Sequence, residues 1–382
     1  MVAGEVSGDC QGANLARALQ AQQPGLQLFG AGGEQMRAAG VDLRVETTHF
    51  SSVGFLEPLR FLWPLRQALR QIREIVQIDR PDLAILIDYH GFNLALARFL
   101  GKQGIPIVYY FPPVVWIGSR FFCRPVAKAT QLIITTFPGE AELYQSYGGH
   151  AVWFGHPLLD IVKPQADHRP IFAQLGLDDQ RPLMAVLPGS RTQEVERLIR
   201  PMLAAARIIQ SRHPDLQFIL PLAAPYLQPL LEAELERAGM TQQFRIITQD
   251  VYTCLSRCAV ILTAAGTATL EATLLEVPMV VTYRLRAISH WLGRRVASTR
   301  FFALPNILHD DWVVPEILGR HVTAERLAEA VLELLERPER ATAMRTRLRE
   351  VRQLLGTEGA VDRAAAQILH EMVGSQPAPT EA

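Results

Sequence analysis

Short apolar runs alternate with segments of helical period along most of the 382 residues. In the first half, runs of strand length are separated by segments in which apolar residues recur every three or four positions, as in an amphipathic helix. The predicted strands are 26–32, 82–88, 105–111 and 131–137, and the predicted helices are 12–22, 57–77 and 92–104. Strands joined through helices pair in parallel with right-handed crossovers, so this half predicts a doubly wound sheet.

The alternation restarts beyond residue 182. Residues 154–182 are rich in proline and charge, which is typical of a linker between domains. Strand-like runs then recur between helical segments: LMAVL, LQFILPLA, FRIITQ, AVILTAA and PMVVTYR. We therefore predict an α/β protein with two doubly wound, Rossmann-like domains in tandem and a cleft between them. Ligands of such sheets bind at the carboxyl ends of the strands.

Composition places the chain among soluble globular proteins. Hydrophobic residues make up 49% and charged residues 20%, and 38 basic residues balance 38 acidic ones, so the totals do not indicate nucleic-acid binding. The longest apolar stretch, IPIVYYFPPVVWIG, is interrupted by prolines and is shorter than the roughly 18 to 20 residues of a transmembrane helix. The first residues do not show the basic and apolar segments of a secretory signal, so we do not expect secretion. We expect a cytosolic protein or one that binds a membrane face.

Several common catalytic centres are excluded. The cysteines are too few and too scattered for a disulfide framework or a zinc site, and we expect them to pack in the core: Cys10, Cys123, Cys254 and Cys258. The chain lacks G-x-S-x-G, P-loop and H-E-x-x-H motifs, and the glycines of FGAGGEQM miss the G-x-G-x-x-G spacing. It also lacks a D-x-D pair. We therefore expect no metal, and a bound diphosphate would be neutralised by arginine and helix dipoles.

Asp88 is a candidate general base. It ends the apolar run DLAILID and precedes YHGFN. A carboxylate at the carboxyl end of a buried parallel strand is partly removed from water, which raises its pKa toward that of a general base. Alternatively, Asp88 caps the helix that follows. His90 is the competing base and is otherwise a loop histidine.

Two loops of the second half suit an anionic ligand. Arg191 follows the turn LPGS at the start of an amphipathic helix, where main-chain N–H groups are unpaired. Residues 264–278, AAGTATLEATLLEVP, place a small-residue loop before another helix, and Glu271 in its first turn is suited to sugar hydroxyls. Each residue also has a structural alternative. Arg191 is then a solvated surface residue and Gly266 forms a tight turn. Thr267 caps the helix, and Glu271 is an ordinary charge in its first turn.

The segment GEVSGD, residues 4–9, has the composition of a loop after a first strand. Only three residues precede it, fewer than a usual strand contains. Its polar side chains Glu5, Ser7 and Asp9 suit either a polar ligand or a well-capped helix start.

A predicted helix within residues 53–72 carries large apolar side chains beside Arg60, Arg66 and Arg70. Such a helix binds an anionic membrane surface or an acyl chain if its apolar groups are exposed. The alternative is a helix whose apolar face belongs to the core.

Seven motifs occur in the order of one known family: AGEVSGD, SSVGFLEPL, IDYHGFN, FGHPLLD, LPGSRTQEV, AAGTATLEATLLEVPMVVTYR and LPNIL. From residue 3 to about residue 320 the chain resembles the lipid-A-disaccharide synthase family. The resemblance implies the GT-B glycosyltransferase fold. It predicts an acceptor-binding, membrane-facing domain at 1–160, a UDP-sugar domain at 161–360, and a helix in 361–382 that packs back on the first domain before a disordered tail. After YY, the chain departs from the family pattern with FPPVVWIGSR.

The resemblance also implies a reaction. UDP-2,3-diacylglucosamine is joined with inversion to 2,3-diacylglucosamine 1-phosphate, giving the β-1,6-linked disaccharide 1-phosphate of lipid A biosynthesis and UDP, without a cofactor, at the inner face of the cytoplasmic membrane. The family's essential aspartate and arginine fall on Asp88 and Arg191. The predicted substrate contacts are Glu5, Ser7, Asp9, Ser190, Gly266, Thr267, Glu271 and Asn306.

Two other functions fit the same architecture. A UDP-N-acetylglucosamine 2-epimerase or a glycan glycosyltransferase would turn over a water-soluble UDP-sugar without a lipid acceptor. An inactive descendant with a shortened first strand would bind UDP without turnover.

Overall fold

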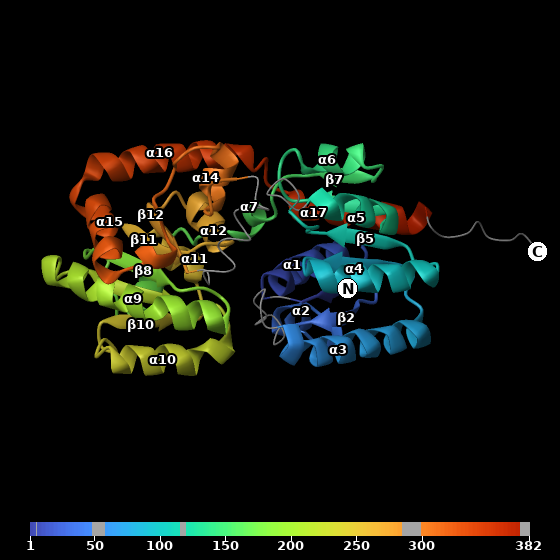
Figure 1. Ribbon diagram of the computed structural model, residues 1–382, viewed down its shortest axis with the longest axis horizontal. Coiled ribbons are helices and arrows are strands. Elements are labelled where there is room, and N and C mark those ends of the chain that lie inside the picture. The colour runs from blue at the N-terminus through green and yellow to red at the C-terminus, as the bar shows by residue number, and fades with distance from the viewer. Residues whose placement is uncertain (5, 48–57, 115–119, 285–298, 375–382) are drawn as a thin grey trace, which may run out of the picture. The chain divides into compact units, whose positions relative to one another are not determined.

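The chain folds into two compact units, each with its own sheet (Figure 1). The computed structural model describes residues 1–382 except 5, 48–57, 115–119, 285–298 and 375–382. Unit 1 consists mainly of Met1–Ile161 and the C-terminal part from Leu355 onward. Unit 2 consists mainly of Val162–Arg295 and Thr299–Leu354. The chain therefore returns to unit 1 after completing unit 2.

Unit 1 is built on a seven-stranded parallel sheet in the order β3-β2-β1-β4-β5-β6-β7. Its strands are β1 (Val2–Ala3), β2 (Phe29–Gly32), β3 (Asp42–Glu46), β4 (Ala84–Ile87), β5 (Ile107–Tyr110), β6 (Leu132–Thr135) and β7 (Ala151–Trp153). The strand order reverses between β1 and β4, where Ala3 pairs with Ile87. The segments that follow these two strands therefore leave the same edge of the sheet as neighbours, which is where doubly wound folds bind ligands.

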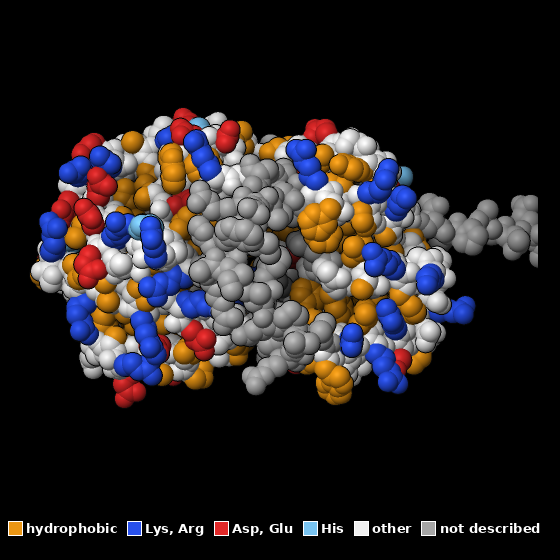
Figure 2. Space-filling view, in the orientation of Figure 1, with side chains coloured by type: hydrophobic (Ala, Val, Ile, Leu, Met, Phe, Trp, Pro, Cys, Tyr) orange, Lys and Arg blue, Asp and Glu red, His pale blue; other side chains and the backbone are white. Residues whose placement is uncertain are grey.

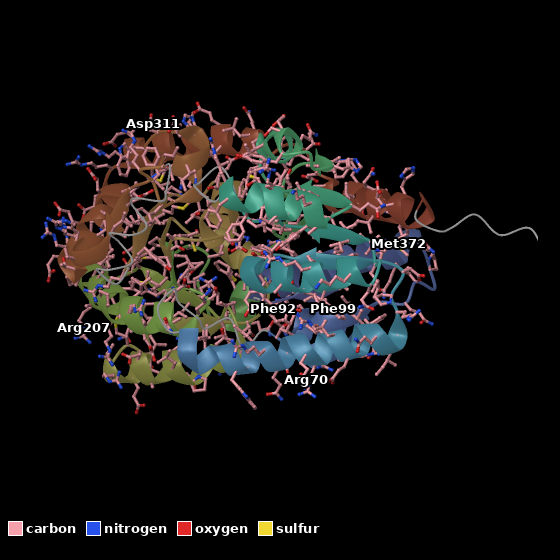
Figure 3. The ribbon with its side chains drawn as sticks, turned by 45° about the vertical axis from the view of Figure 1, so that its right-hand side comes forward. Arg70, Phe92, Phe99, Arg207, Asp311 and Met372 are labelled. Carbon is pink, nitrogen blue, oxygen red and sulfur yellow. The ribbon has the colours of Figure 1, made fainter. Side chains whose placement is uncertain are left out.

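Helices cover both faces of this sheet. One face carries α1 (Val6–Gln22), α2 (Glu34–Ala38) and α17 (Ala360–Gly374), and the other carries α3 (Pro58–Asp79), α4 (His90–Lys102), α5 (Cys123–Ala129) and α6 (Glu140–Ser146). Because both faces are covered, β4 and β5 are buried throughout and read as continuous apolar runs. Phe92 and Phe99 lie between α4 and α3 in Figure 3, and the Arg73 guanidinium lies 5.3 Å from the Phe99 ring centre.

Unit 2 repeats this plan with a six-stranded parallel sheet in the order β10-β9-β8-β11-β12-β13. Its strands are β8 (Leu183–Leu187), β9 (Gln217–Pro221), β10 (Phe244–Ile247), β11 (Val260–Ala264), β12 (Met279–Tyr283) and β13 (Glu316–Leu318). Its helices include α8 (Arg169–Leu175), α9 (Thr192–Arg212), α10 (Gln228–Arg237), α11 (Val251–Ser256), α12 (Ala268–Leu274), α14 (Leu304–His309), α15 (Ala324–Glu336) and α16 (Pro338–Leu354). The order reverses between β8 and β11.

The predicted α/β architecture is confirmed, with local corrections. Helix α1 begins at Val6, so most of GEVSGD is the first turn of a helix rather than a loop, and β1 has only two residues. The expected linker at 154–182 contains α8 and the short α7 (Leu158–Ile161). A proline in the first turn favours the start of α8, and Gly176, with a φ of 65°, ends it. In the part of the chain that the structure describes, no helix is long and apolar enough to cross a membrane.

Candidate functional site

The first polar cluster lies where the strand order of unit 1 reverses. Asp88 directly follows β4, and Ser7, in the first turn of α1, follows β1. The Ser7 hydroxyl donates a hydrogen bond to Asp88 Oδ2 at 3.4 Å, and both residues are half-buried. The structure thus brings two predicted site residues together. The side chain of His90, the competing base, and all of Glu5 lie outside the described residues.

The backbone at Asp88 is strained. Asp88 and Tyr89 have φ angles of 52° and 48°, in the left-handed region that costs residues with a Cβ about 1–3 kcal/mol each. This conformation turns the chain sharply from β4 into α4. A side chain at Gly4 would overlap the Tyr89 ring, so the turn after β1 requires glycine there. Conformations of this kind persist only where surrounding contacts hold them, and they are common at functional sites.

Asp9 has a structural role, and its contact with substrate stays a prediction. The side chain is 3% exposed, and its carboxylate accepts main-chain hydrogen bonds from Gly33, Gln35 and Met36 at 2.8, 3.0 and 3.1 Å. These bonds cap the start of α2. The position of Asp9 inside α1, rather than in a loop, directs its carboxylate to α2.

The second cluster begins in the loop between β8 and α9. The carboxylate of Glu194 accepts hydrogen bonds from the Ser190 main-chain N–H, the Arg191 guanidinium and the Tyr283 hydroxyl, each at 3.3 Å. Gly189 has a φ of 122°, and a Cβ there would lie 2.7 Å from the Cβ of Glu194. Glycine is therefore required for the loop to fold around this carboxylate. The Arg191 side chain is 39% exposed, which leaves room for a ligand.

Tyrosine hydroxyls from other elements complete this loop. Tyr226 donates to the Ser190 carbonyl oxygen at 2.9 Å. Burial raises the pKa of Tyr283, and the negative charge of Glu194 raises it further, so its hydroxyl remains a donor. Neither tyrosine, nor the role of Glu194, was predicted from the sequence. Tyr283 is the last residue of a predicted strand, so its position at the carboxyl edge of the sheet could have been inferred from the sequence. Tyr226 lies in no recognisable motif.

The loop between β11 and α12 lies next to this cluster, because β8 and β11 are neighbouring strands. Gly266 and Thr267 are exposed, and the Thr267 side chain does not cap α12. Among the described residues, no acceptor is bonded to the main-chain N–H groups of Gly266, Thr267 and Ala268. The loop therefore presents free donors at a sheet edge where anionic ligands bind.

Glu271 lies one turn into α12. Its carboxylate accepts a hydrogen bond from the Tyr252 hydroxyl at 3.1 Å. Burial raises the pKa of Glu271, and the Tyr252 hydrogen bond opposes that effect. The arrangement orients one carboxylate oxygen and leaves the other as an acceptor for a hydroxyl donor.

The side chain of Asn306 is held by other groups of the protein, and its contact with UDP stays a prediction. The residue is fully buried in α14. Its Nδ2 donates to the Val314 carbonyl oxygen at 2.9 Å and to Glu316 Oε1 at 2.8 Å, and its Oδ1 accepts from the main-chain N–H groups of Val313 and Val314 at 2.8 Å each. These four bonds use the full capacity of the amide. Asn306 therefore stabilises the segment before β13.

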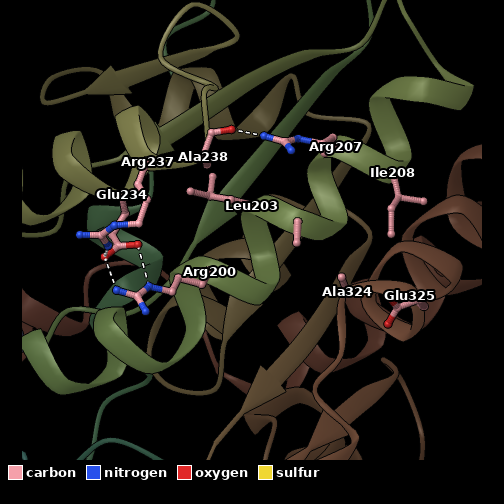
Figure 4. A pocket seen from close by; sticks show the side chains of 10 residues that line it. Arg200, Leu203, Arg207, Ile208, Glu234, Arg237, Ala238, Ala324 and Glu325 are labelled. Atoms are coloured by element: carbon pink, nitrogen blue, oxygen red, sulfur yellow. Dashed lines mark hydrogen bonds and ion pairs between the residues drawn. The ribbon is translucent and has the colours of Figure 1, made fainter.

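A separate hollow of about 440 Å³ lies between α9, α10 and α15 (Figure 4). Its arginines already have partners: Arg200 and Arg237 pair with Glu234, and Arg207 donates to the Ala238 carbonyl oxygen. None of the predicted site residues lines it. In the parts of the chain that the structure describes, no group of three or more His, Cys, Asp or Glu side chains is placed to hold a metal ion.

Solved structures with a similar architecture include a UDP-sugar epimerase and a glycosyltransferase. A UDP-N-acetylglucosamine 2-epimerase from Neisseria meningitidis, bound to UDP-GlcNAc, has a TM-score of 0.65 and 13% identity, with 98% of each chain covered. WaaG, a glycosyltransferase involved in lipopolysaccharide biosynthesis, has a TM-score of 0.53 and 13% identity, covering 96% of each chain. The chain therefore has the two-domain α/β fold shared by GT-B glycosyltransferases and these epimerases.

Sequence relatives define the family more narrowly. The family described as lipid-A-disaccharide synthetase matches residues 1–371. A lipid-A-disaccharide synthase of Geobacter sulfurreducens is 35% identical over 377 residues, covering 98% of this chain and 97% of the relative. One of Synechocystis is 35% identical over 384 residues, covering 98% and 97%. The chain belongs to the lipid-A-disaccharide synthetase family, and the predicted membership is confirmed.

Proposed function

We propose that this chain transfers 2,3-diacylglucosamine from UDP to the 6-hydroxyl of 2,3-diacylglucosamine 1-phosphate. Family membership over residues 1–371 supplies the reaction class, a hexosyl transfer. The structural observation that carries the proposal is the position of the two polar clusters. Each follows the pair of strands at which its sheet reverses order, and this is the ligand position of doubly wound folds.

Unit 2 is assigned the UDP-sugar. Arg191 binds diphosphate oxygens, and the free N–H groups at Gly266–Ala268 donate to the same anion. Glu271 accepts from ribose hydroxyls, as carboxylates do at other nucleotide sites. The exposed hydroxyls of Ser190 and Thr267 supply further donors at this edge.

Unit 1 is assigned the acceptor. Asp88 takes the proton from the acceptor 6-hydroxyl while that oxygen attacks C1 of the donor sugar. The new C1–O6 bond forms as the bond from C1 to the diphosphate oxygen breaks, and UDP leaves with the electron pair. The Ser7 hydrogen bond helps to orient the Asp88 carboxylate. Arg191 and the free N–H groups stabilise the charge that develops on the leaving diphosphate.

The test is UDP release by purified protein given the diacylated donor with and without 2,3-diacylglucosamine 1-phosphate, in detergent. The proposal predicts acceptor-dependent release and a disaccharide 1-phosphate by mass spectrometry. Turnover of a water-soluble UDP-sugar without a lipid acceptor would favour an epimerase, and UDP binding without any turnover would favour a non-catalytic protein. Arg191→Ala should abolish tight UDP binding. Arg169→Ala, at an exposed arginine paired with Asp167 in the same unit, is the matched control.

A membrane surface is the second partner we propose, contacted by the outer face of α3, α4 and α5. The core stripe of α3, Ala68, Ile72 and Val76, is buried, whereas Trp63 is 72% exposed. Phe121 precedes α5 and is 65% exposed. Aromatic side chains in such positions insert at the headgroup level of a bilayer.

Cations are frequent in the same layer, where Arg70 also pairs with Glu74 of α3. The exposed lysines and arginines of the layer are Arg66, Arg70, Arg98, Lys102, Arg120, Arg124 and Lys128, and neither α4 nor α5 contains an acidic residue. Figure 2 shows lysine, arginine and hydrophobic side chains spread over this face of unit 1, with few acidic ones. Because the whole chain is neutral, this charge is a local feature. Anionic lipid attracts it by about 1 kcal/mol per cation near the surface.

Vesicle sedimentation tests this contact. We expect binding to vesicles that contain an anionic lipid and much weaker binding to purely zwitterionic vesicles. Phe121→Ser and Arg124→Gln should each weaken the binding several-fold, whereas Trp312→Ser, at a 52% exposed tryptophan of unit 2, should not. Equal binding of all three variants would contradict the assignment of this face.

A further inference from the structure

The left-handed turn that carries Asp88 is held from several sides. The Asp88 main-chain N–H donates to the Tyr110 carbonyl oxygen at 3.2 Å. The Asp88 carbonyl oxygen accepts from Asn93 Nδ2 at 2.7 Å and from the Tyr109 hydroxyl at 2.9 Å. Among the described residues, Asp88 and Tyr89 are the one place where two consecutive residues other than glycine have positive φ angles.

Asn93 contributes most to this arrangement. Its side chain is fully buried. Besides the bond to Asp88, its Nδ2 donates a second hydrogen bond, to the Ile87 carbonyl oxygen at 3.1 Å. One amide thus binds the last carbonyl of β4 and the carbonyl of the residue after it. Its Oδ1 is buried and has no hydrogen-bond partner among the residues that the structure describes, so the amide acts here as a donor alone. An aspartate of the same shape would place a carboxylate against two carbonyl oxygens.

We propose that Asn93 is a positioning residue for the reaction, with Tyr109 as its auxiliary. The inference rests on the proposed role of Asp88 as the general base. Because Asn93 bonds to the backbone of Asp88 and not to its carboxylate, it sets the direction in which the carboxylate leaves the turn. A displacement of about 1 Å at a reacting group is enough to cost about a hundredfold in rate.

The alternative is that Asn93 only stabilises the start of α4. A stability role lowers the folded fraction and changes every activity in proportion. A positioning role lowers turnover per folded molecule, and this loss depends on the carboxylate of Asp88. It leaves UDP affinity unchanged, because UDP is assigned to unit 2. The two roles therefore differ in their response to a second substitution at Asp88.

The test is a double-mutant cycle with Asn93→Ala and Asp88→Asn, measured as acceptor-dependent UDP release per folded protein. Asn93→Ala should lower kcat about tenfold to a hundredfold in the parent and less than twofold in the Asp88→Asn background. UDP affinity by calorimetry should stay within twofold. Gln145→Ala is the matched control, because its amide also donates to a strand carbonyl of unit 1, that of Ala151 at 2.7 Å, and its loss should leave kcat unchanged.

Tyr109→Phe removes one hydrogen bond to the Asp88 carbonyl oxygen without emptying the core. It keeps the proposal testable if Asn93→Ala does not fold, and it should lower kcat by a smaller factor with the same dependence on Asp88. Equal fold-losses in both backgrounds would overturn the positioning role. Full activity of Asp88→Asn would overturn the base assignment instead, and absence of acceptor-dependent release in the parent would overturn the proposed function.

Discussion

Replacement of Asp9 separates a structural role from a substrate contact. In Asp9→Ala, the main-chain N–H groups of Gly33, Gln35 and Met36 lose their acceptor, and the bonds from Gly33 and Met36 are buried. An unsatisfied buried donor costs about 1–3 kcal/mol, and the substitution leaves two of them. We therefore expect the variant to lose about 3–5 kcal/mol of stability. For a domain of this size, that lowers the Tm by about 10 °C.

Asp9→Asn is the informative partner variant. Gly33 and Met36 both donate to Oδ1, which asparagine retains, whereas Gln35 donates to Oδ2. We expect Asn to recover more than half of the loss. Thermal and urea unfolding, followed by circular dichroism, measure both variants, and acceptor-dependent UDP release measures KM. Equal stability of the Ala variant and the parent, together with a raised KM, would refute the capping role and support the predicted contact of Asp9 with substrate.

Two further substitutions test the loop of Arg191 and the pH dependence of stability. Gly189→Ala should weaken UDP binding about tenfold or more, because its Cβ would displace Glu194. Gly176→Ala is the control, because Gly176 also has a positive φ, of 65°, but has open space around it. It should cost only about 1 kcal/mol of stability and leave UDP binding unchanged. Equal UDP affinities of the two variants by calorimetry would contradict the proposed role of this loop. The hydrogen bond from Arg200 lowers the pKa of Glu234 to about 2, below its usual 4.5. The stabilisation of the folded state by this ion pair is therefore present above pH 4.5 and is lost as the pH falls toward 2. Glu234→Gln should therefore be less stable than the parent at pH 7 in urea, with a gap that closes toward pH 2, and equal stability at pH 7 would contradict the pairing.

Most of the strands and helices could be predicted from the pattern of hydrophobic residues. Strands such as AILI in β4 are buried on both faces, so they appear as uninterrupted apolar runs between helical segments. Parallel pairing then places the residues that follow the strands at one edge, which explains why Asp88, Arg191 and Gly266 were predictable as candidates. The short strands β3 and β7 lack such runs, because β3 is mostly polar and β7 has only three residues.

The hydrogen-bond partners of the site residues were not predictable in this way. Asp9 and Asn306 lie in segments that match the family. Asp9, however, caps a helix that begins 25 residues later, and the side-chain amide of Asn306 is hydrogen-bonded to the segment before β13. Tyr226 and Tyr252 reach their partners from other elements. Such contacts depend on tertiary packing, and no local spacing in the sequence encodes them.

The assignment of Asp88 as the base is tested most directly by Asp88→Asn, with kcat for acceptor-dependent UDP release and the Kd for UDP measured on the same preparation. We predict that kcat falls about a hundredfold or more while the Kd stays within twofold, because the proposed base lies in unit 1 and the proposed UDP contacts lie in unit 2. Retained turnover, or a loss of UDP affinity that matches the loss of rate, would contradict it.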